Sequence, residues 1–183
     1  MKLNNDFILE RYGLKLRFVD VYDAEYIFNL RTDPLLGRFI NKTSHHLSDQ
    51  IQWIKQYKGR EAEGLEYYFI FTKDDCRVGV IRIYNIEKDN ATSGSWICSP
   101  NLPFEIPTLI VLIMREIFFE TLEIENELMD TRLGNKKVIR MHKLFGAEII
   151  RQDEIDVFHL LTKKAFLVNK QKILSYVGQN EDT

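Results

Sequence analysis

Alternating apolar and polar positions near the N-terminus predict a strand followed by a helix. Hydrophobic and basic side chains alternate over residues 14–18, which is typical of a half-buried strand. Asp23 then begins a helical stretch in which Ile27 and Leu30 lie on one face. We expect this helix to end at Asp33-Pro34, because proline breaks a helical pattern.

A second helix and a hairpin follow. Apolar residues recur at helical spacing between residues 51 and 57, behind Ser48, which we expect as the N-cap. Residues 67–72 are dense in aromatic and β-branched side chains. The polar stretch 73–75 then precedes an alternating segment over residues 78–86, so two antiparallel strands joined by a turn are predicted.

The middle of the chain predicts one more strand and a buried helix. The strand covers residues 92–98 and stops at Ser99-Pro100, because proline cannot donate to a sheet ladder. Pro107 lies where a first helical residue is expected. The run from there to Leu122 contains one charged pair, Arg115-Glu116, and one further charge at Glu120, so this helix should be covered on most sides.

The C-terminal third continues with a strand over residues 128–133, an N-cap at Asn135 and a helix that ends at Gly146. Strands near residues 148–151 and 156–162 follow, and a last helix closes the chain. The apolar faces of the two helices consist of Val138, Met141, His142 and Phe145 in the first, and Phe166, Ile173, Leu174 and Val177 in the second.

This order predicts a mixed α/β fold in one domain over residues 1–183. We expect a mostly antiparallel sheet of six to seven strands with helices on both faces. The strand–helix–strand passage from residue 92 to residue 133 implies one parallel pair with a right-handed crossover.

Composition narrows the class of partner. The charges nearly balance, with 25 basic and 27 acidic residues in 183, so the broad basic stripe of a nucleic-acid binder is missing. Cys76 and Cys98 are expected as free thiols in a reducing compartment. Residues 1–10 lack the apolar stretch of a secretory signal, and Leu109–Met114 is too short to span a membrane. A cytoplasmic protein without nucleic-acid or membrane partners is predicted.

Several segments, in chain order, resemble the GNAT superfamily of N-acetyltransferases over roughly residues 14–163. They are similar to the branch that contains ribosomal-protein and sugar-nucleotide acetyltransferases. The segments are Leu16-Arg17 with Asp23, Leu30-Arg31-Thr32-Asp33-Pro34, Val78-Gly79-Val80, the corner Ser99-Pro100-Asn101-Leu102, and Asn135 followed by Gly146.

Within that branch the chain resembles the acetyltransferases that modify the free amine of a nucleotide-linked 4-amino-4,6-dideoxy sugar. The resemblance implies acetyl transfer from acetyl-CoA to such an amine in surface polysaccharide or glycan synthesis. It also implies that Arg31, His46, Trp53 and Tyr84 contact the acceptor. For each residue taken singly, the pattern favours the alternative: core or rim aromatics at Trp53 and Tyr84 and a surface ion pair at Arg31.

For the acyl donor, the resemblance implies that strands 92–98 and 128–133 splay apart and that the pantetheine arm lies beside Ile97 and Cys98. It also places Asn135 at the cofactor. The alternative is ordinary sheet interior, which Cys98 suits as a small buried hydrophobe.

The loop that should hold the pyrophosphate departs from the family. Family members use a glycine-rich turn at a helix N-terminus, where free amides and the helix dipole favour an anion. Here residues 99–107 contain no glycine and no basic residue, and Glu105 adds a negative charge. The amides of Phe104, Glu105, Ile106 and Thr108 remain as candidates for a phosphate.

Direct attack of an amine on a thioester needs a proton acceptor, an oxyanion donor and a proton source. The family often places a Glu and a Tyr for these tasks. Counting from Pro100-Asn101 puts Ser93 at the Glu position, and counting from Asn135 puts His142 at the Tyr position. His142 could protonate a thiolate or relay a proton through water, and a packing histidine is the alternative.

Three functions therefore stay open. The first is an acetyl-CoA-dependent N-acetyltransferase, and the second is a non-catalytic relative that keeps the fold as a binding module. The third is an acyltransferase with another donor, such as an acyl carrier protein. No metal is expected, because His45 and His46 lack further ligands at a recognisable spacing. A homodimer through Phe118-Phe119 or the polar surface of the second helix is left open.

Overall fold

A computed structural model describes residues 2–41 and 44–178. The strands are β1 (Ile8–Arg11), β2 (Leu14–Phe18), β3 (Tyr67–Lys73), β4 (Cys76–Tyr84), β5 (Asn90–Cys98), β6 (Asn126–Arg132), β7 (Glu148–Gln152) and β8 (Asp156–Thr162). The helices are α1 (Ala24–Thr32), α2 (Leu47–Glu63), α3 (Glu105–Glu116), α4 (Lys136–Leu144) and α5 (Lys163–Tyr176). Short helical turns are η1 (Val21–Asp23), η2 (Gly37–Phe39) and η3 (Ile117–Thr121).

The strands form an eight-stranded sheet in the order β1-β2-β3-β4-β5-β6-β8-β7. Every neighbouring pair is antiparallel except β5 and β6, which are parallel and connected through α3. The predicted mixed α/β fold with one parallel pair is therefore confirmed. The strand that the sequence did not indicate is β1, which pairs with β2 through a turn at Tyr12 and Gly13, both with positive φ.

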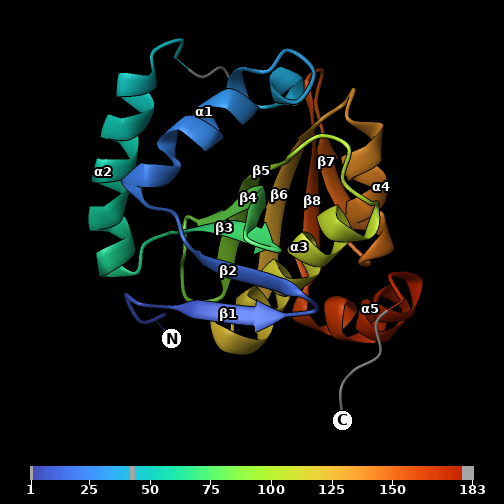
Figure 1. Ribbon diagram of the computed structural model, residues 1–183. Helices are drawn as coiled ribbons and strands as arrows, with labels where there is room; N and C mark the ends of the chain where they lie inside the picture. Colours follow the sequence, from blue (N-terminus) through green and yellow to red (C-terminus); the bar gives the residue numbers. More distant parts are fainter. Residues whose placement is uncertain (1, 42–43, 179–183) are drawn as a thin grey trace.

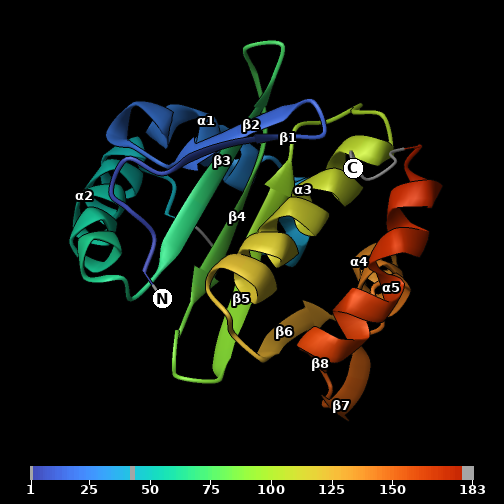
Figure 2. The ribbon, with the colours of Figure 1, turned by 90° about the horizontal axis from the view of Figure 1, so that it is seen from below.

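Helices cover both faces of this sheet (Figures 1 and 2). Alternation along β3 decides which side chain goes to which face: Tyr68 and Ile70 pack with α1 and α2, whereas Phe69 and Phe71 join the cluster that contains α3 and α5. A strand that is buried on both faces of a sheet has a continuous run of apolar residues in its sequence. This explains why residues 67–71 carry no polar side chain except the tyrosine hydroxyls.

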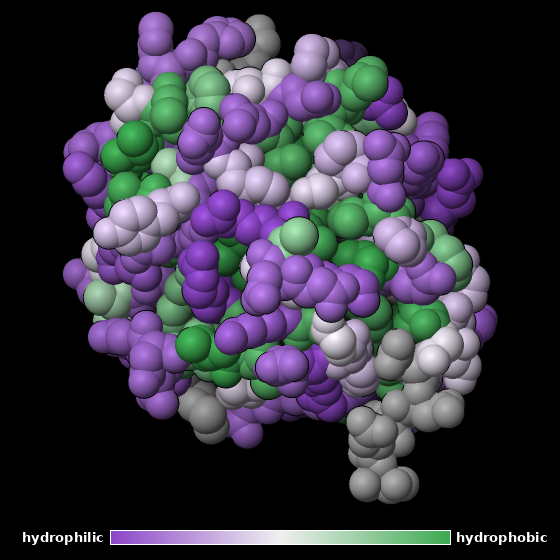
Figure 3. All heavy atoms as spheres, in the orientation of Figure 1, coloured by the Kyte–Doolittle hydropathy of each residue, from purple (hydrophilic) through white to green (hydrophobic). Residues whose placement is uncertain are grey.

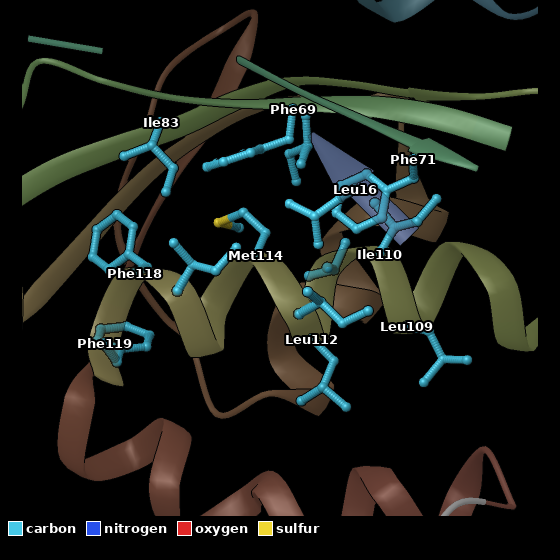
Figure 4. Packing of buried hydrophobic residues seen from close by; sticks show 14 of the residues in the cluster. Leu16, Phe69, Phe71, Ile83, Leu109, Ile110, Leu112, Met114, Phe118 and Phe119 are labelled. Carbon is cyan, nitrogen blue, oxygen red and sulfur yellow. The ribbon is translucent and has the colours of Figure 1, made fainter. Parts of the chain in front are cut away.

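The helix α3 fills the larger core. Residues from Ile106 to Glu116 are buried with the exception of Pro107, as the nearly uninterrupted apolar run predicted. Figure 4 shows Ile110 and Met114 directed at Leu16 and Phe69 of the sheet, while Leu109 and Phe119 point to the opposite side. Apolar burial on two sides holds α3 tightly in place, and with it every side chain that α3 presents to the site.

Two predicted helix starts are wrong by one or two residues. The N-cap of α2 is His46 instead of Ser48, and its side chain makes no cap hydrogen bond. The helix α3 begins at Glu105, so Pro107 is its third residue instead of its first. Proline is tolerated there because the first-turn amides of a helix lack partners within the helix.

The surface agrees with a balanced composition. On the face in Figure 3, hydrophobic residues lie in small groups between hydrophilic ones. Phe118 and Phe119 are fully buried, so they belong to the core and not to an interface. Among the described helices, none has the length and apolarity to cross a membrane.

Candidate active site

A cleft opens where β5 and β6 part. Their parallel pairing is limited to three residue pairs, from Asn90 with Asn126 to Thr92 with Leu128. Beyond Thr92 the edge of β5 that faces β6 has no strand beside it, and a cavity of about 190 Å³ occupies the gap. It is lined by Ser93, Gly94, Ser95 and Trp96 of β5, Met129, Asp130, Thr131 and Arg132 of β6, and residues of α1, β4, α3 and α4.

An irregularity in β5 shapes this edge. Val80 pairs with Ile97 and Arg82 pairs with Gly94, so Ile81 on β4 lies opposite two residues of β5. One of them, Ser95, has a positive φ of 51°. Such a bulge bends the strand and redirects its backbone groups, and here it does so at the cavity wall.

The cavity reaches both faces of the sheet. Val111 and Met114 of α3 line it from one face, and Arg31 of α1 together with Phe39 of η2 lines it from the other. Two ligands can therefore approach each other from opposite sides.

The face toward α3 holds a buried polar chain. Nε of Arg115 donates to Oε2 of Glu127 at 2.7 Å, and both side chains are fully buried. Oγ of Ser93 donates to the other carboxylate oxygen of Glu127. Nη2 of Arg115 also lies 3.1 Å from Sδ of Met129. A buried ion pair requires such additional bonds, because its charges have lost their water.

His142 extends this chain to the cavity. Its Nδ1 lies 3.1 Å from Nη2 of Arg115, and its ring is 5.1 Å from the ring of His159. Burial, and then the charges of Arg115 and His159, lower the pKa of His142 well below its usual range. His142 lines the cavity as a neutral imidazole.

The face toward α1 and α2 is rich in arginine and aromatic side chains. A second cavity of about 290 Å³ adjoins the first, since Arg31, Arg82 and Ser95 line both. The guanidinium of Arg82 lies 4.1 Å from the ring centre of Tyr84 and 5.4 Å from that of Trp53. Its Nε is buried without a hydrogen-bond partner in the described residues.

Two tyrosines in this region stay protonated near neutral pH. Burial raises the pKa of Tyr68 to about 12, although Arg31 and Arg82 act in the opposite direction. Burial, and then the negative charge of Asp130, raise the pKa of Tyr84. Both hydroxyls can therefore donate hydrogen bonds to a ligand.

The segment after α1 closes the outer side of the first cavity. Leu36, Phe39 and Ile40 contribute to the lining. The segment is joined to β6 by a hydrogen bond of 2.9 Å from Nη2 of Arg132 to Oδ1 of Asn41. Arg132 is itself fixed by Asp156 on β8 at 3.0 Å.

The loop before α3 offers few amides to a phosphate. The amide of Ile106 donates to the carbonyl of Pro103 at 3.1 Å, so it is already bonded within the loop. Thr108 is the fourth residue of α3 and lies within the hydrogen-bonded part of the helix. Its hydroxyl also donates to the carbonyl of Phe104. Of the four predicted amides, those of Phe104 and Glu105 remain.

Two side chains of this loop also pack or are buried within the protein. Phe104 packs edge-on against Tyr176 of α5. The carboxylate atom Oε2 of Glu105 is buried without a hydrogen-bond partner in the described residues. A negative charge at the first helical residue already satisfies part of the positive helix end, which disfavours an additional anion.

The structure places most predicted site residues at the two cavities. Arg31, Tyr84, Ser93, Asn135 and His142 line the first, and Trp53 lines the second together with Arg31. His46 lines neither cavity. It is exposed as the N-cap of α2, so the structure gives no support to its predicted contact with the acceptor.

Ile97 and Cys98 lie one and two strand positions beyond the cavity lining, which ends at Trp96. Ile97 is buried in the cluster under α1 and α2, whereas Cys98 packs on the opposite side, against the α3 cluster. Burial raises the pKa of the Cys98 thiol to about 12, which argues against a thiolate nucleophile. Asn135 is the N-cap of α4, as predicted, and accepts from the amide of Val138.

Four residues of the site were missed by the sequence reasoning: Asp130, Arg82, Arg115 and Glu127. Arg82 precedes Tyr84 by two positions on a predicted strand, so the two share a face, and this spacing could have identified it. Arg115 and Glu127 were visible only as charges beside apolar runs, a pattern that also fits a surface ion pair.

Comparison with known proteins decides the family. A family model described as an acetyltransferase (GNAT) domain matches residues 14–148. The chain belongs to the GNAT acetyltransferase family. As a GNAT enzyme it is an N-acetyltransferase, and the interpretation as a non-catalytic module is set aside. A search of curated protein sequences finds no match.

Solved GNAT structures share this fold. FdhC, described as a nucleotide-linked sugar GNAT, is 30% identical with a TM-score of 0.83, covering 94% of this chain and 99% of FdhC. The ribosomal-protein-S5-alanine acetyltransferase from Vibrio fischeri is 15% identical with a TM-score of 0.74, over 86% and 97%. The N-acetyltransferase PseH of Campylobacter jejuni is 18% identical with a TM-score of 0.66, over 82% and 98%. PseH has also been solved in complex with acetyl coenzyme A.

Proposed function

We propose that this protein transfers an acetyl group from acetyl-CoA to the amine of a nucleotide-linked amino sugar, in the cytoplasm and within one domain. The observation that carries the proposal is a cavity through the sheet with an arginine–aromatic cluster at one face. The similarity to FdhC, a nucleotide-linked sugar GNAT, supports the same class of acceptor.

The acceptor should bind on the face toward α1 and α2. Arg31 and Arg82 line both cavities there, and guanidinium groups form paired hydrogen bonds with phosphate oxygens. Trp53 and Tyr84 flank Arg82 and offer flat surfaces to a base or sugar ring. Together these side chains suit a diphosphate linked to a sugar.

The thioester should enter along the open edge of β5. Backbone groups of Ser95 and Trp96 lie at the cavity wall, where they can bond a pantetheine arm or the oxyanion of the reaction. The amine nitrogen attacks the thioester carbonyl carbon, the new C–N bond forms, and the C–S bond breaks.

Asp130 is the acidic residue among those lining the first cavity. We assign it the role of accepting the proton of the attacking amine. Alternation along β6 places it on the face opposite Met129, which packs in the α3 cluster, so Asp130 lies on the acceptor face. The proton passes to this carboxylate and then to solvent, and the thiolate of CoA takes a proton from solvent.

The proposal is tested by assaying CoA release from acetyl-CoA with a panel of nucleotide-linked amino sugars. A productive acceptor should be found in that panel, and Asp130→Asn should lower kcat/KM by about 100-fold. Asp74→Asn, at an exposed hairpin position with positive φ, is the matched control and should leave the rate unchanged. Acetylation of small polyamines or peptide amines alone would contradict the assigned acceptor.

The phosphates of the donor should bind at α4 instead of at the loop before α3. The first turn of α4 carries Lys136 and Lys137, both exposed, and Asn135 at its N-cap lines the cavity. Calorimetric titration should show weaker acetyl-CoA binding for Lys136→Ala with Lys137→Ala. Lys164→Ala with Lys172→Ala, two exposed lysines of α5, should bind acetyl-CoA as the wild type does.

Glu105 at the start of α3 favours a second candidate, an acyl donor attached to a carrier protein. Such a donor presents phosphopantetheine without the adenosine diphosphate contacts. If acetyl-pantetheine bound as tightly as acetyl-CoA, and a carrier-linked acyl group were transferred faster, this donor would replace acetyl-CoA.

A further inference from the structure

A chain of four buried side chains connects the interior of the sheet to the cavity. It runs from Ser93 through the carboxylate of Glu127 and the guanidinium of Arg115 to Nδ1 of His142. Arg115 and Glu127 are fully buried. They come from α3 and β6, elements that the larger core holds rigidly.

The direction of each hydrogen bond fixes the state of His142. A guanidinium group has only donors, so Nδ1 of His142 must accept from Arg115, and the ring proton must be on Nε2. A doubly protonated ring would place two positive charges 3.1 Å apart in a buried site. Two groups face the ring, Arg115 of α3 and His159 of β8. Glu127 of β6 binds Arg115 and neutralises its charge.

We propose that Arg115 and Glu127 are positioning residues that hold His142 as a neutral hydrogen-bond donor at the cavity. Through Nε2–H, His142 then stabilises the negative charge that develops on the thioester during acetyl transfer. This inference rests on the proposed function for the reaction itself, although the protonation state follows from this geometry alone.

The role differs from that of an acid or a base. Nδ1 is occupied by Arg115, so His142 has no lone pair with which to take the proton of the amine. It also keeps its own proton, because a neutral imidazole that lost it would become an anion. The amine's proton leaves through Asp130 to solvent, and sulfur takes its proton from solvent, so His142 is unchanged after each turnover.

The tautomer can be measured without any ligand. In protein labelled with ¹⁵N-histidine, the chemical shifts of His142 should report an unprotonated Nδ1 and a protonated Nε2, with no titration between about pH 5 and about pH 8. The variant His159→Gln lacks the neighbouring ring, so the signals that disappear are those of His159 and not those of His142. An Nδ1–H tautomer, or protonation of His142 near pH 6.5, would overturn the proposal even if the enzyme were active.

A double variant isolates the positioning pair. Arg115→Met with Glu127→Gln removes both buried charges together and so leaves no unpaired ion behind. Once circular dichroism shows a folded protein, His142 should titrate at a pKa raised toward about 6.5, and kcat should fall by up to about 100-fold. An unchanged tautomer and titration in this variant would show that Arg115 does not position His142.

Two substitutions of His142 separate donation from packing. Glutamine can place an N–H close to the position of Nε2, whereas phenylalanine fills the space without a donor. His142→Gln should keep kcat within about tenfold of the wild type, and His142→Phe should lose about 100-fold, with the KM for acetyl-CoA little changed in both. Equal losses in the two variants, or no loss in either, would contradict donation.

Discussion

At the scale of single residues, Arg82 shows how a strand position becomes a binding group. Alternation along β4 sends its side chain to the face opposite α3, where two aromatic rings flank the guanidinium. The buried Nε lacks a partner in the described part of the chain. A buried unsatisfied donor is costly, and a ligand oxygen would remove this cost.

Arg82→Met should therefore weaken acceptor binding selectively. Methionine keeps much of the apolar contact with Trp53 and Tyr84 but loses the charge and the donors. The KM for the nucleotide-linked acceptor should rise by about 10- to 100-fold, while the affinity for acetyl-CoA in calorimetry stays the same. An equal loss of affinity for both substrates would place Arg82 in a structural role.

Asp23 gives a stability prediction that depends on pH. Burial alone would raise its pKa, but bonds from Arg17 and the Asp20 amide, and the charges of Arg17 and Arg77, outweigh burial and hold the pKa below its usual value. Because the folded pKa is depressed, the stabilisation is present above the unfolded pKa of about 3.9 and is lost as pH falls through the folded value.

Asp23→Asn should consequently lower the free energy of unfolding by about 2 kcal/mol at neutral pH. Urea unfolding at a series of pH values should show the two proteins converging below about pH 4. A difference that persisted unchanged well below about pH 4 would mean that the Asp23 carboxylate contributes through its shape and not through its charge.

At the scale of elements, the end of α4 depends on a glycine. Gly146 has a φ of 94°, and a Cβ added to it would lie 2.5 Å from Nδ2 of Asn169. That amide donates to the carbonyl of Ala165 at 2.8 Å, so it cannot move without breaking a bond on α5. The turn after α4 therefore lies in close contact with α5.

Gly146→Ala should destabilise more than Gly13→Ala. Gly13 also has a positive φ, but a Cβ there would meet nothing within 4 Å. The variant Gly13→Ala therefore measures the cost of backbone strain alone, about 1 kcal/mol. Gly146→Ala should cost about 1 kcal/mol more through the lost bond of Asn169. Thermal unfolding of both variants measures the difference, and equal costs would show that α4 and α5 adjust freely.

The elements were predictable because each carries its own pattern, and the site was less so because its parts come from distant elements. The resemblance to the family pointed to Ser93 and His142, by counting from the motifs that carry it. Their connection runs through Arg115 and Glu127, and no local sequence pattern indicates that these two residues pair. β1 was missed because its residues alternate weakly and are half exposed at the sheet edge. Helix starts shifted where Pro107 and Ser48 fit more than one first-turn position.

At the scale of the whole molecule, the sheet consists of two parts joined weakly at β5 and β6. Three residue pairs connect them, and α3, which packs on the first part, also reaches β6 through the ion pair of Arg115 with Glu127. A donor lying along the open edge of β5 would take the place of the missing ladder. Ligand binding should therefore stabilise the molecule as a unit.

Acetyl-CoA at about 100 times its Kd should add about 2.7 kcal/mol and raise Tm by about 5 to 10 °C. Hydrogen exchange should slow most for amides of β5 and β6 beyond Thr92 and Leu128. Protection confined to α5 or to β1 would place the donor elsewhere.

A cavity that reaches both faces of the sheet also determines the order of chemical events. Because α3 borders one entrance and α1 with η2 borders the other, donor and acceptor can occupy the enzyme together. The buried Cys98 thiol, with its raised pKa, is a poor carrier for the acetyl group. Steady-state rates should accordingly give intersecting double-reciprocal lines, the signature of a ternary complex, whereas parallel lines would reveal an acetylated enzyme.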